Sequence, residues 1–355
     1  SFNPFELFSL EQSCDPNTSF SETTTTGIDY DIDHPIYKTQ SCTLYIGRCD
    51  NKYYALKTSQ SSNILNREWK NYSAIGKFPT IINAINLIKE TDHNLLCSKA
   101  NYYLQLEYAF GGSIANFIQF INHREAWRIL AHISSALDHI HKSGFIHLDI
   151  SPSNILQCYY NKSIEISQNT ENDFDKDEEI VIEKNSLYKL ADFGTVIKEG
   201  CYGNFCEGAG PYVSPEALKW PNSEFPVTSK TDIWSLGAVM FEIVTHKKMP
   251  RDSKRYDAIR SGTLDLSAII PEEFDIIKQM LEVDPSMRPS AEQLMQLPKV
   301  KDILQSLEED LAFDSANDEI INGVIKENSQ QNVSKMAWGQ TFPNKRPLRQ
   351  FFDLI

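Results

Sequence analysis

Apolar and polar residues alternate between residues 37 and 57, which is typical of strands with one buried face. The apolar positions of this stretch include Leu44, Ile46, Tyr54 and Leu56. The dipeptide Asp50-Asn51 divides the stretch in two and is typical of a turn. The pattern therefore predicts two antiparallel strands joined by a short turn.

Two stretches further along the chain predict another strand and a long helix. Residues 102 to 106 form an apolar run that predicts a buried strand. From Arg124 to Ser143 the apolar residues recur with the period of an amphipathic helix, and Gly144 closes the stretch. They are Trp127, Leu130, Ile133, Leu137 and Ile140. The two stretches therefore predict a buried strand and a long helix.

Composition narrows the choice of partners and compartment. The chain has 34 basic and 48 acidic residues and a net charge of -14, which argues against binding to nucleic acid or to an anionic membrane. Seven cysteines without a C-x-x-C pair favour reduced thiols, and so the nucleus or cytoplasm, over disulfides or zinc. No apolar run approaches the roughly 18 residues of a spanning helix, so we expect no membrane span.

One stretch indicates the chemistry. Residues 147–156 have the sequence HLDISPSNIL, and Asp192-Phe193-Gly194 follows downstream. An aspartate, an asparagine five residues later and a second aspartate before Phe-Gly form the motif set of a protein kinase. Asp149 would accept the proton of the substrate hydroxyl. Asn154 and Asp192 would bind Mg²⁺, because carboxylate and amide oxygens suit a hard cation.

The residues for ATP lie upstream. Tyr54-Ala55-Leu56-Lys57 resembles the kinase strand V-A-I-K, whose lysine bridges the α- and β-phosphates of ATP. By spacing, Glu68 would be its partner. Residues 107–113 resemble the kinase hinge, where the backbone of Glu107 and Ala109 would hydrogen-bond adenine. We expect the apolar walls of the adenine site to be Leu44, Ala55, Leu156 and, at the gatekeeper position, Leu106.

Two departures weaken this resemblance. The positions of the glycine-rich loop hold Tyr37, Thr39 and Cys42, although glycine lets backbone N–H groups approach phosphates. Ser151 replaces the catalytic-loop lysine, so this catalytic position can supply only a neutral donor. The departures leave open a pseudokinase, a scaffold that keeps the fold and acts by binding partners. The retained catalytic residues favour the enzyme.

One pair of charged residues and one further aspartate extend the kinase resemblance to about residues 35–300. Glu216 lies in a Ser-Pro-Glu version of the kinase A-P-E motif, and its expected buried partner is Arg288. Asp232 resembles the helical aspartate that holds the backbone of the catalytic loop. The resemblance therefore implies the α+β, two-lobed protein-kinase fold, with a small β-rich lobe that has one main helix and a larger, mostly helical lobe.

Further motifs are similar to the Wee/Myt family of inhibitory kinases. They are Met249-Pro250-Arg251 and residues 258–262, 280–285 and 290–294. Leu148 agrees, because this family lacks the arginine of H-R-D and has no evident partner for a phosphorylated activation loop. The resemblance implies phosphorylation of an inhibitory tyrosine, and in the Myt branch also a threonine, of a cyclin-dependent kinase. The substrate would be that kinase or its cyclin complex, and the result would be restrained entry into mitosis.

The domain boundaries follow from these motifs. We expect a flexible arm over 1–30, a small lobe over 31–108, a large lobe over 109–302 and a tail over 303–355. An acidic insert at about 159–185 would be a solvated loop or a docking site for a basic partner. The tail pairs basic and aromatic residues, which suits docking on an acidic or apolar groove, or it is a free end. The Myt membrane segment has no counterpart in residues 301–355, so a soluble Wee-like kinase is favoured, and we expect it to be a monomer.

Overall fold

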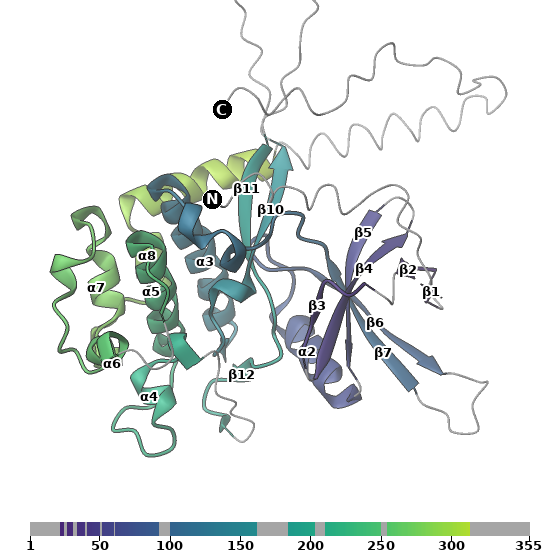
Figure 1. The fold of residues 1–355 in the computed structure, drawn as a ribbon, viewed down its shortest axis with the longest axis horizontal. Coiled ribbons are helices and arrows are strands. Elements are labelled where there is room, and N and C mark those ends of the chain that lie inside the picture. The colour runs from purple at the N-terminus through teal and green to yellow at the C-terminus, as the bar shows by residue number, and fades with distance from the viewer. Residues whose placement is uncertain are drawn as a thin grey trace, which may run out of the picture.

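The chain forms two lobes that lie side by side (Figure 1). The structure, a computed structural model, describes residues 22–24, 27–30, 34–39, 41–49, 52–59, 61–91, 100–161, 184–202, 210–249 and 254–312. Strands dominate the first lobe and helices the second. The predicted two-lobed α+β kinase fold is confirmed.

The small lobe is a twisted antiparallel sheet with one helix. Its strands are β1 (Glu22–Thr23), β2 (Asp29–Tyr30), β3 (Tyr37–Lys38), β4 (Cys42–Cys49), β5 (Lys52–Ser59), β6 (Ala84–Thr91) and β7 (Ala100–Glu107). They follow the order β1-β2-β4-β5-β7-β6, and β3 pairs with β4. The predicted pair of strands is β4 and β5, which pair along their whole length. Helix α2 (Ser62–Ile75) buries Leu65, Tyr72 and Ile75 in the core.

Residues 22–24 and 27–30 correct the expectation of a flexible arm over residues 1–30, because they are part of the small-lobe structure. Strand β2 adds to β4, with Tyr30 opposite Gly47. Ile28 and Tyr30 are only 2% and 4% exposed, because they pack with Leu56, Ile88 and Tyr103 in one apolar cluster. Gly47 makes room for this contact, since a Cβ there would lie 2.7 Å from Ile28 Cγ2. Because most residues of this segment are polar, the sequence did not indicate that Ile28 and Tyr30 are core residues. Residues 1–21 lie outside the described part of the chain.

The large lobe is built around two long helices. Helix α3 (His123–Lys142) is the predicted amphipathic helix, and the side chain of Asn122 caps it by accepting the N–H of Glu125. Helix α5 (Lys230–Thr245) is buried along nearly all of its length. The remaining elements are β8 (Gly112–Ser113), β9 (Phe145–Ile146), β10 (Ile155–Asn161), β11 (Lys184–Leu190), β12 (Ile197–Lys198), α4 (Pro215–Leu218), α6 (Lys254–Arg260), α7 (Ile276–Met280), α8 (Ala291–Met295) and a helix over residues 298–312.

Two predicted boundaries fall inside regular structure. Strands β10 and β11 pair as far as Asn161 opposite Lys184, so the strands include both ends of the insert predicted at about 159–185. The helix over residues 298–312 runs through the predicted lobe boundary at residue 302. Residues 162–183 and 313–355, with most of the insert and the basic and aromatic tail, lie outside the described part.

A short backbone contact joins the lobes. Ile81, in the segment between α2 and β6, forms a parallel bridge with Leu190 of β11. Leu190 donates its N–H to the Thr80 carbonyl and accepts the N–H of Ile82, both at 2.9 Å. This contact lies just before Asp192, so it fixes that residue relative to the small lobe.

The predicted pair of Glu216 and Arg288 is confirmed. The two side chains form a bidentate contact with N–O distances of 2.7 and 2.8 Å, and both are fully buried. Arg288 also donates to the carbonyls of Glu282, Val283 and Lys230. Two buried charges are stable together only when their hydrogen bonds are satisfied, as they are here. The pair ties α4, which ends the activation segment, to the helical core.

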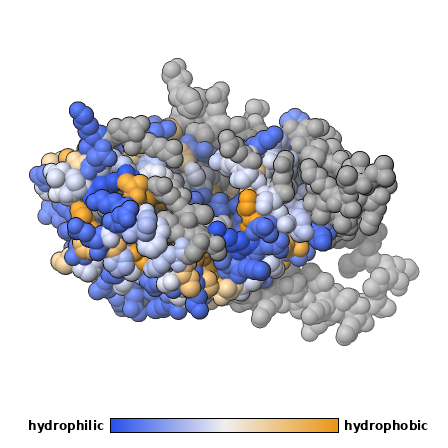
Figure 2. All heavy atoms as spheres, turned by 90° about the horizontal axis from the view of Figure 1, so that it is seen from below, coloured by the Kyte–Doolittle hydropathy of each residue, from blue (hydrophilic) through white to orange (hydrophobic). Residues whose placement is uncertain are grey.

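The face of the molecule shown in Figure 2 is mainly polar. On the face shown in Figure 2, hydrophobic residues form small patches among hydrophilic ones. A surface of this kind is usual for a folded domain. Within the described ranges, no helix combines the length and apolar character that crossing a membrane requires.

The packing of Ile28 gives a test of the small lobe. Ile28→Ala should lower the free energy of unfolding by about 2 to 5 kcal/mol, because it leaves a cavity against β4 and β5. Ile36→Ala is the matched control, since Ile36 is 41% exposed and the same change there should cost under about 0.5 kcal/mol. Urea unfolding measures both values. Equal effects would show that residues 22–30 are not part of the core.

Candidate active site

A buried carboxylate on α5 shapes the loop that carries Asp149. Asp232 accepts the N–H of His147 and of Leu148, both at 2.8 Å, and lies 2.8 Å from His141 Nε2. Leu148 has a φ of 69°, a left-handed conformation that is rare for leucine. The two charge-assisted hydrogen bonds stabilise this strained turn. The predicted role of Asp232 is confirmed.

Asp149 and Asn154 contact each other directly. The Asn154 amide nitrogen donates to the Asp149 backbone carbonyl and to Asp149 Oδ2, both at 2.8 Å. These bonds orient the Asp149 carboxylate and turn the Asn154 amide oxygen away from it. The sequence assigned the two residues separate roles, and their spacing carried no sign of this hydrogen bond.

Lys57 brings three distant segments together. Its ammonium nitrogen lies 2.8 Å from Glu68 Oε2 and 2.9 Å from Asp192 Oδ1. Lys57 is on β5, Glu68 is on α2, and Asp192 follows β11. The predicted pair of Lys57 and Glu68 is therefore present. The ammonium also reaches the carboxylate that the sequence assigned to Mg²⁺.

Burial and charge act on these groups in opposite senses. Burial raises the pKa of Glu68 to about 7, against the attraction of Lys57. Burial acts to lower the pKa of Lys57, but the carboxylates of Glu68 and Asp192 outweigh it and raise that pKa above its ordinary value. Burial likewise acts to raise the pKa of Asp192, but Lys57 holds it below its ordinary value. Asp192 is therefore ionised at neutral pH, as a metal ligand must be.

The segment around Asp192 is closely packed. Phe193 is fully buried and stacks on Tyr72 of α2, with ring centroids 4.2 Å apart, while His147 meets its ring edge-on at 5.1 Å. Burial lowers the pKa of His147, so this ring is neutral at neutral pH. Thr195 donates its hydroxyl to the His147 carbonyl at 2.9 Å. Phe193 thus lies between α2 and the catalytic loop.

The predicted adenine-site residues come from both lobes. Ala55 of β5 pairs with Leu106 of β7, and both are buried. Leu44 of β4 and Leu156 of β10 are partly buried against the same core. All four side chains belong to or pack against one large apolar cluster, and their role as walls of an adenine site stays a prediction.

Glu107 has a structural use that the sequence did not indicate. Its carboxylate lies 2.5 Å from Lys189 Nζ and accepts the N–H of Asn83 at 3.1 Å. Its own N–H donates to the Asn83 carbonyl at 2.9 Å. The Glu107 side chain thus ties the hinge to β11 and to the segment before β6. Contact with a nucleotide would fall to the backbone of Glu107 and Ala109, which stays a prediction.

The loop without glycine is closed by its own side chain. The Thr39 hydroxyl accepts the N–H of Ser41 at 3.3 Å and of Cys42 at 3.0 Å. The same hydroxyl lies 3.1 Å from the Cys42 carbonyl, and the Thr39 N–H donates to that carbonyl at 2.8 Å. Two backbone donors of the kind that bind phosphate in a glycine-rich loop are therefore satisfied within this turn. A threonine at a glycine position was the only sequence signal for this closure.

Ser151 is buried within the catalytic loop. Ser151 is only 3% exposed, and its backbone carbonyl accepts the N–H of Asn154 at 3.0 Å. The residue has extended backbone, with a φ of −151°. It lies between Asp149 and Asn154 in the chain, where the sequence predicted a neutral donor in place of a lysine cation.

These residues fit ATP and Mg²⁺. Asn154 and Asp192 supply the amide and carboxylate oxygens that Mg²⁺ prefers, and Asp192 is kept ionised. Lys57 supplies an ammonium group beside Asp192 at 2.9 Å, where phosphate oxygens would need a cation. The fit is weaker at the Thr39 turn, because two of its N–H groups already have partners.

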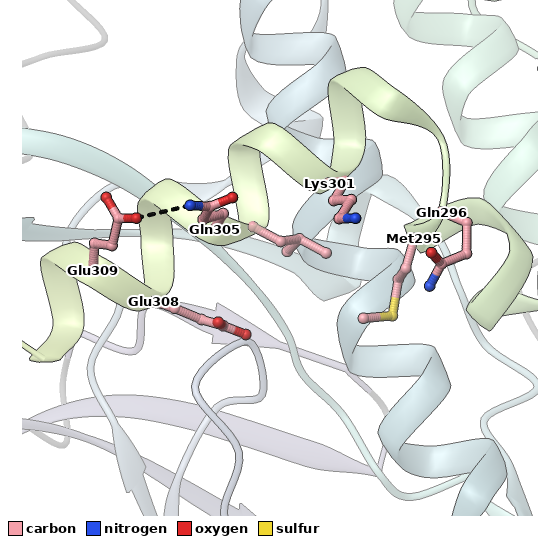
Figure 3. A pocket seen from close by; sticks show the side chains of 7 residues that line it. Met295, Gln296, Lys301, Gln305, Glu308 and Glu309 are labelled. Carbon is pink, nitrogen blue, oxygen red and sulfur yellow. Dashed lines mark hydrogen bonds between the residues drawn. The ribbon is translucent and has the colours of Figure 1, made fainter.

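A hollow at the C-terminal end of the large lobe is separate from this site. Its lining consists of Met295, Gln296, Lys301, Leu304, Gln305, Glu308 and Glu309 (Figure 3). Gln305 donates to Glu309 at 3.0 Å along the same helix. None of the predicted site residues lines this hollow.

The Lys57 ion pair gives a test of the site's electrostatics. Lys57→Met should lower the free energy of unfolding by about 3 to 5 kcal/mol, because it leaves the fully buried Glu68 carboxylate without a countercharge. Adding Glu68→Gln should recover part of that loss, with a coupling of about 1 to 3 kcal/mol. Lys52→Met on the same strand is the control and should have little effect. Additive single changes in urea unfolding would contradict the pairing.

Comparison with known proteins agrees with this geometry. The protein kinase domain model matches residues 39–170 and 171–299. Wee1-like protein kinase 2 of Ailuropoda melanoleuca is 29% identical over 282 residues, and that of Canis lupus familiaris is 30% identical over 283 residues. Each match covers 74% of this chain and 47% of the relative. A Wee1-like protein kinase of Oryza sativa subsp. japonica is 30% identical over 175 residues, which cover 49% of this chain and 28% of the relative.

The share of each protein that a match covers limits what can be inferred from it. This chain spans less than half the length of each of these relatives. The domain match covers most of the chain and includes Lys57, Asp149 and Asp192. The chain therefore belongs to the protein kinase family and resembles the Wee-type kinases within it.

Proposed function

We propose that this protein transfers the γ-phosphoryl group of ATP to a hydroxyl group of a protein substrate, with Mg²⁺ as cofactor. The observation that carries the proposal is the meeting of Lys57, Glu68 and Asp192 within 2.9 Å. A second support is the hydrogen bond that orients Asp149 through Asn154. Catalysis of phosphoryl transfer is mainly positioning and electrostatics, and this arrangement supplies both.

Each residue has a defined part in the transfer. The substrate oxygen attacks the γ-phosphorus, the bond to the bridging oxygen of ADP breaks, and Asp149 takes the hydroxyl proton. Lys57 holds the α- and β-phosphates, and Glu68 orients Lys57. Asn154 and Asp192 hold Mg²⁺, which neutralises the charge that develops on the phosphates. Ser151 supplies a hydroxyl donor where the kinase motif has a lysine.

We further propose that the substrate is a cyclin-dependent kinase, alone or with its cyclin. The target would be its inhibitory tyrosine, or also a threonine, and the effect would be restrained entry into mitosis. The support is the resemblance of residues 249–251, 258–262 and 280–285 to Wee-type kinases, together with relatives that bear the name Wee1-like. Leu148 lies in an apolar cluster with Ile197 and Val213 of the activation segment, which fits control without activation-loop phosphorylation.

The scaffold alternative has less support. The relatives that match are named as kinases, so the comparisons do not favour a pseudokinase. Compared with the kinase motifs, the proposed phosphate site lacks one cation, because Ser151 replaces a lysine. It also lacks two free backbone donors, because the Thr39 hydroxyl accepts the N–H groups of Ser41 and Cys42. Both changes are expected to slow transfer and weaken nucleotide binding, whereas Asp149 and Asp192 remain in place.

The proton acceptor and the metal ligand can be separated by mutation. Asp149→Asn should abolish phosphorylation of a cyclin-dependent kinase complex and leave ATP affinity nearly unchanged, because the lost group acts in the transition state. Asp192→Asn should weaken ATP·Mg²⁺ binding and transfer together. Phosphosite mapping reports the transfer, and the thermal shift with ATP and Mg²⁺ reports binding.

Two results would overturn this proposal. One is a folded wild-type protein whose melting temperature does not change at millimolar ATP with Mg²⁺. The other is full biological activity of Asp149→Asn in cells when the wild-type protein transfers no phosphate to the kinase complex. The second result would establish the scaffold function instead.

Ser151 tests whether the enzyme is slowed by a missing cation. Ser151→Lys should speed transfer by up to about 10²-fold, since one stabilising group at an electrostatic site is worth about that much. Ser153→Lys is the matched control, because it adds the same charge at an exposed position of the same loop. Initial rates at saturating ATP measure the effect. An equal gain in both variants would indicate a general attraction for ATP, and no gain would show that the cation is not what limits the rate.

A further inference from the structure

Helix α2 touches the Asp192 segment through a residue that no kinase motif includes. The Asn71 amide nitrogen donates to the Phe193 carbonyl at 2.8 Å and to the Val196 carbonyl at 3.0 Å. Asn71 lies one turn after Glu68 and directly before Tyr72. One side chain therefore ties α2 to both ends of the tetrapeptide that follows Asp192.

Asp192, directly before the tetrapeptide, has an uncommon backbone conformation. Asp192 has a φ of 62°, in the left-handed region, and its carboxylate accepts the N–H of Gly194 at 3.2 Å. Such a conformation persists only when surrounding contacts hold it. The two carbonyls that Asn71 binds flank Gly194, and carbonyls left without donors in this partly buried place would favour a different backbone shape.

The usual alternative anchor is missing. An arginine before Asp149 would allow a phosphorylated activation segment to hold this region, but the position holds Leu148. Leu148 instead packs against Ile197 and Val213. Besides the contact of Lys57 with Asp192 and the packing of Phe193 on Tyr72, the Asn71 amide and the Thr195 hydroxyl also hold the start of the segment.

We propose that Asn71 is a positioning residue that keeps Asp192 in place to bind Mg²⁺. It does so by clasping the carbonyls of Phe193 and Val196, so that the position of α2 and the conformation of this segment are coupled without phosphorylation. The proposal rests on the proposed function, because it assigns the clasp to the metal ligand of the same site. Asn71 itself contacts neither nucleotide nor metal.

The clasp has a specific thermodynamic signature. If Asp192 holds its position in only part of the molecules, the apparent affinity for a ligand that needs Asp192 falls by that fraction. ADP with Mg²⁺ needs Asp192. Adenosine has no phosphate, and its contacts would lie at the hinge and at Ala55 and Leu106. Loss of the clasp should therefore lower the affinity for ADP·Mg²⁺ and leave the affinity for adenosine unchanged.

The test uses the full chain with Asn71→Leu and Asn71→Asp. Both keep the branched shape of asparagine and remove the N–H donors. Asn66→Leu and Asn66→Asp are matched controls, because Asn66 is on the same helix and its amide donates to Ser62 within that helix. We expect about tenfold weaker binding of ADP·Mg²⁺ in calorimetry for the Asn71 variants, as when the competent fraction falls to a tenth. Adenosine affinity should stay within about twofold.

Hydrogen exchange of the ligand-free protein separates this proposal from the proposed function. Peptides that cover residues 190–198 should exchange faster in both Asn71 variants than in the wild type and the Asn66 controls. This result would support the clasp even if the wild-type protein bound no nucleotide, which would refute only the proposed function. Unchanged exchange would overturn the clasp. Equal loss of ADP·Mg²⁺ and adenosine affinity would also overturn it, because it would indicate a general disturbance of the lobe.

Discussion

The burial of the Glu68 carboxylate is the constraint on which the small lobe and the site depend. A buried carboxylate is stable as an ion only beside a countercharge, and Lys57 supplies it at 2.8 Å. Because Lys57 also contacts Asp192 at 2.9 Å, the same charge fixes a residue of the large lobe. Strand β5, helix α2 and the Asp192 segment therefore cannot move independently. Packing of Phe193 against Tyr72 reinforces this arrangement with apolar contact.

The large lobe uses the same principle at two other points. Asp232 accepts the N–H groups of His147 and Leu148, and Glu216 receives the guanidinium of Arg288. In each case a fully buried carboxylate has its hydrogen bonds satisfied by a segment that would otherwise be a loose loop. Buried helix α5 provides the rigid support for the catalytic loop. The geometry of the loop that carries Asp149 is thus set by a buried carboxylate, Asp232, that lies outside the proposed chemistry.

The two departures from the kinase motifs have different physical effects. The Thr39 turn satisfies N–H groups of Ser41 and Cys42 internally, which makes the loop a closed unit and weakens its capacity for phosphates. In the proposed reaction, Ser151 would leave the γ-phosphate without the nearby lysine cation, whereas the loop backbone keeps the hydrogen bond from the Asn154 N–H to the Ser151 carbonyl. The first departure concerns binding and the second concerns rate. An enzyme with modest affinity and slow transfer is consistent with both.

Much of the fold and of the site could be predicted from the sequence alone. The period of apolar residues predicted β4, β5 and α3, and the resemblance to kinase motifs implied the pairs of Lys57 with Glu68 and of Glu216 with Arg288. Charged partners leave a signature because each side chain is identifiable by type. The packing of residues 27–30 escaped prediction, because a segment with only two apolar residues, Ile28 and Tyr30, shows no apolar period.

The tertiary structure alone decided the contacts whose partners are backbone groups. The Asn154 bond to Asp149, the Thr39 turn and the Asn71 clasp all involve main-chain carbonyls or N–H groups. Every residue except proline carries both groups, so the sequence contains no mark of which one a side chain will reach. The answer depends on how closely two segments approach, and for Asn71 and Phe193 those segments are 122 residues apart. Side-chain identity therefore determined the chemistry of this protein, and the approach of its backbone segments determined how that chemistry is held in place.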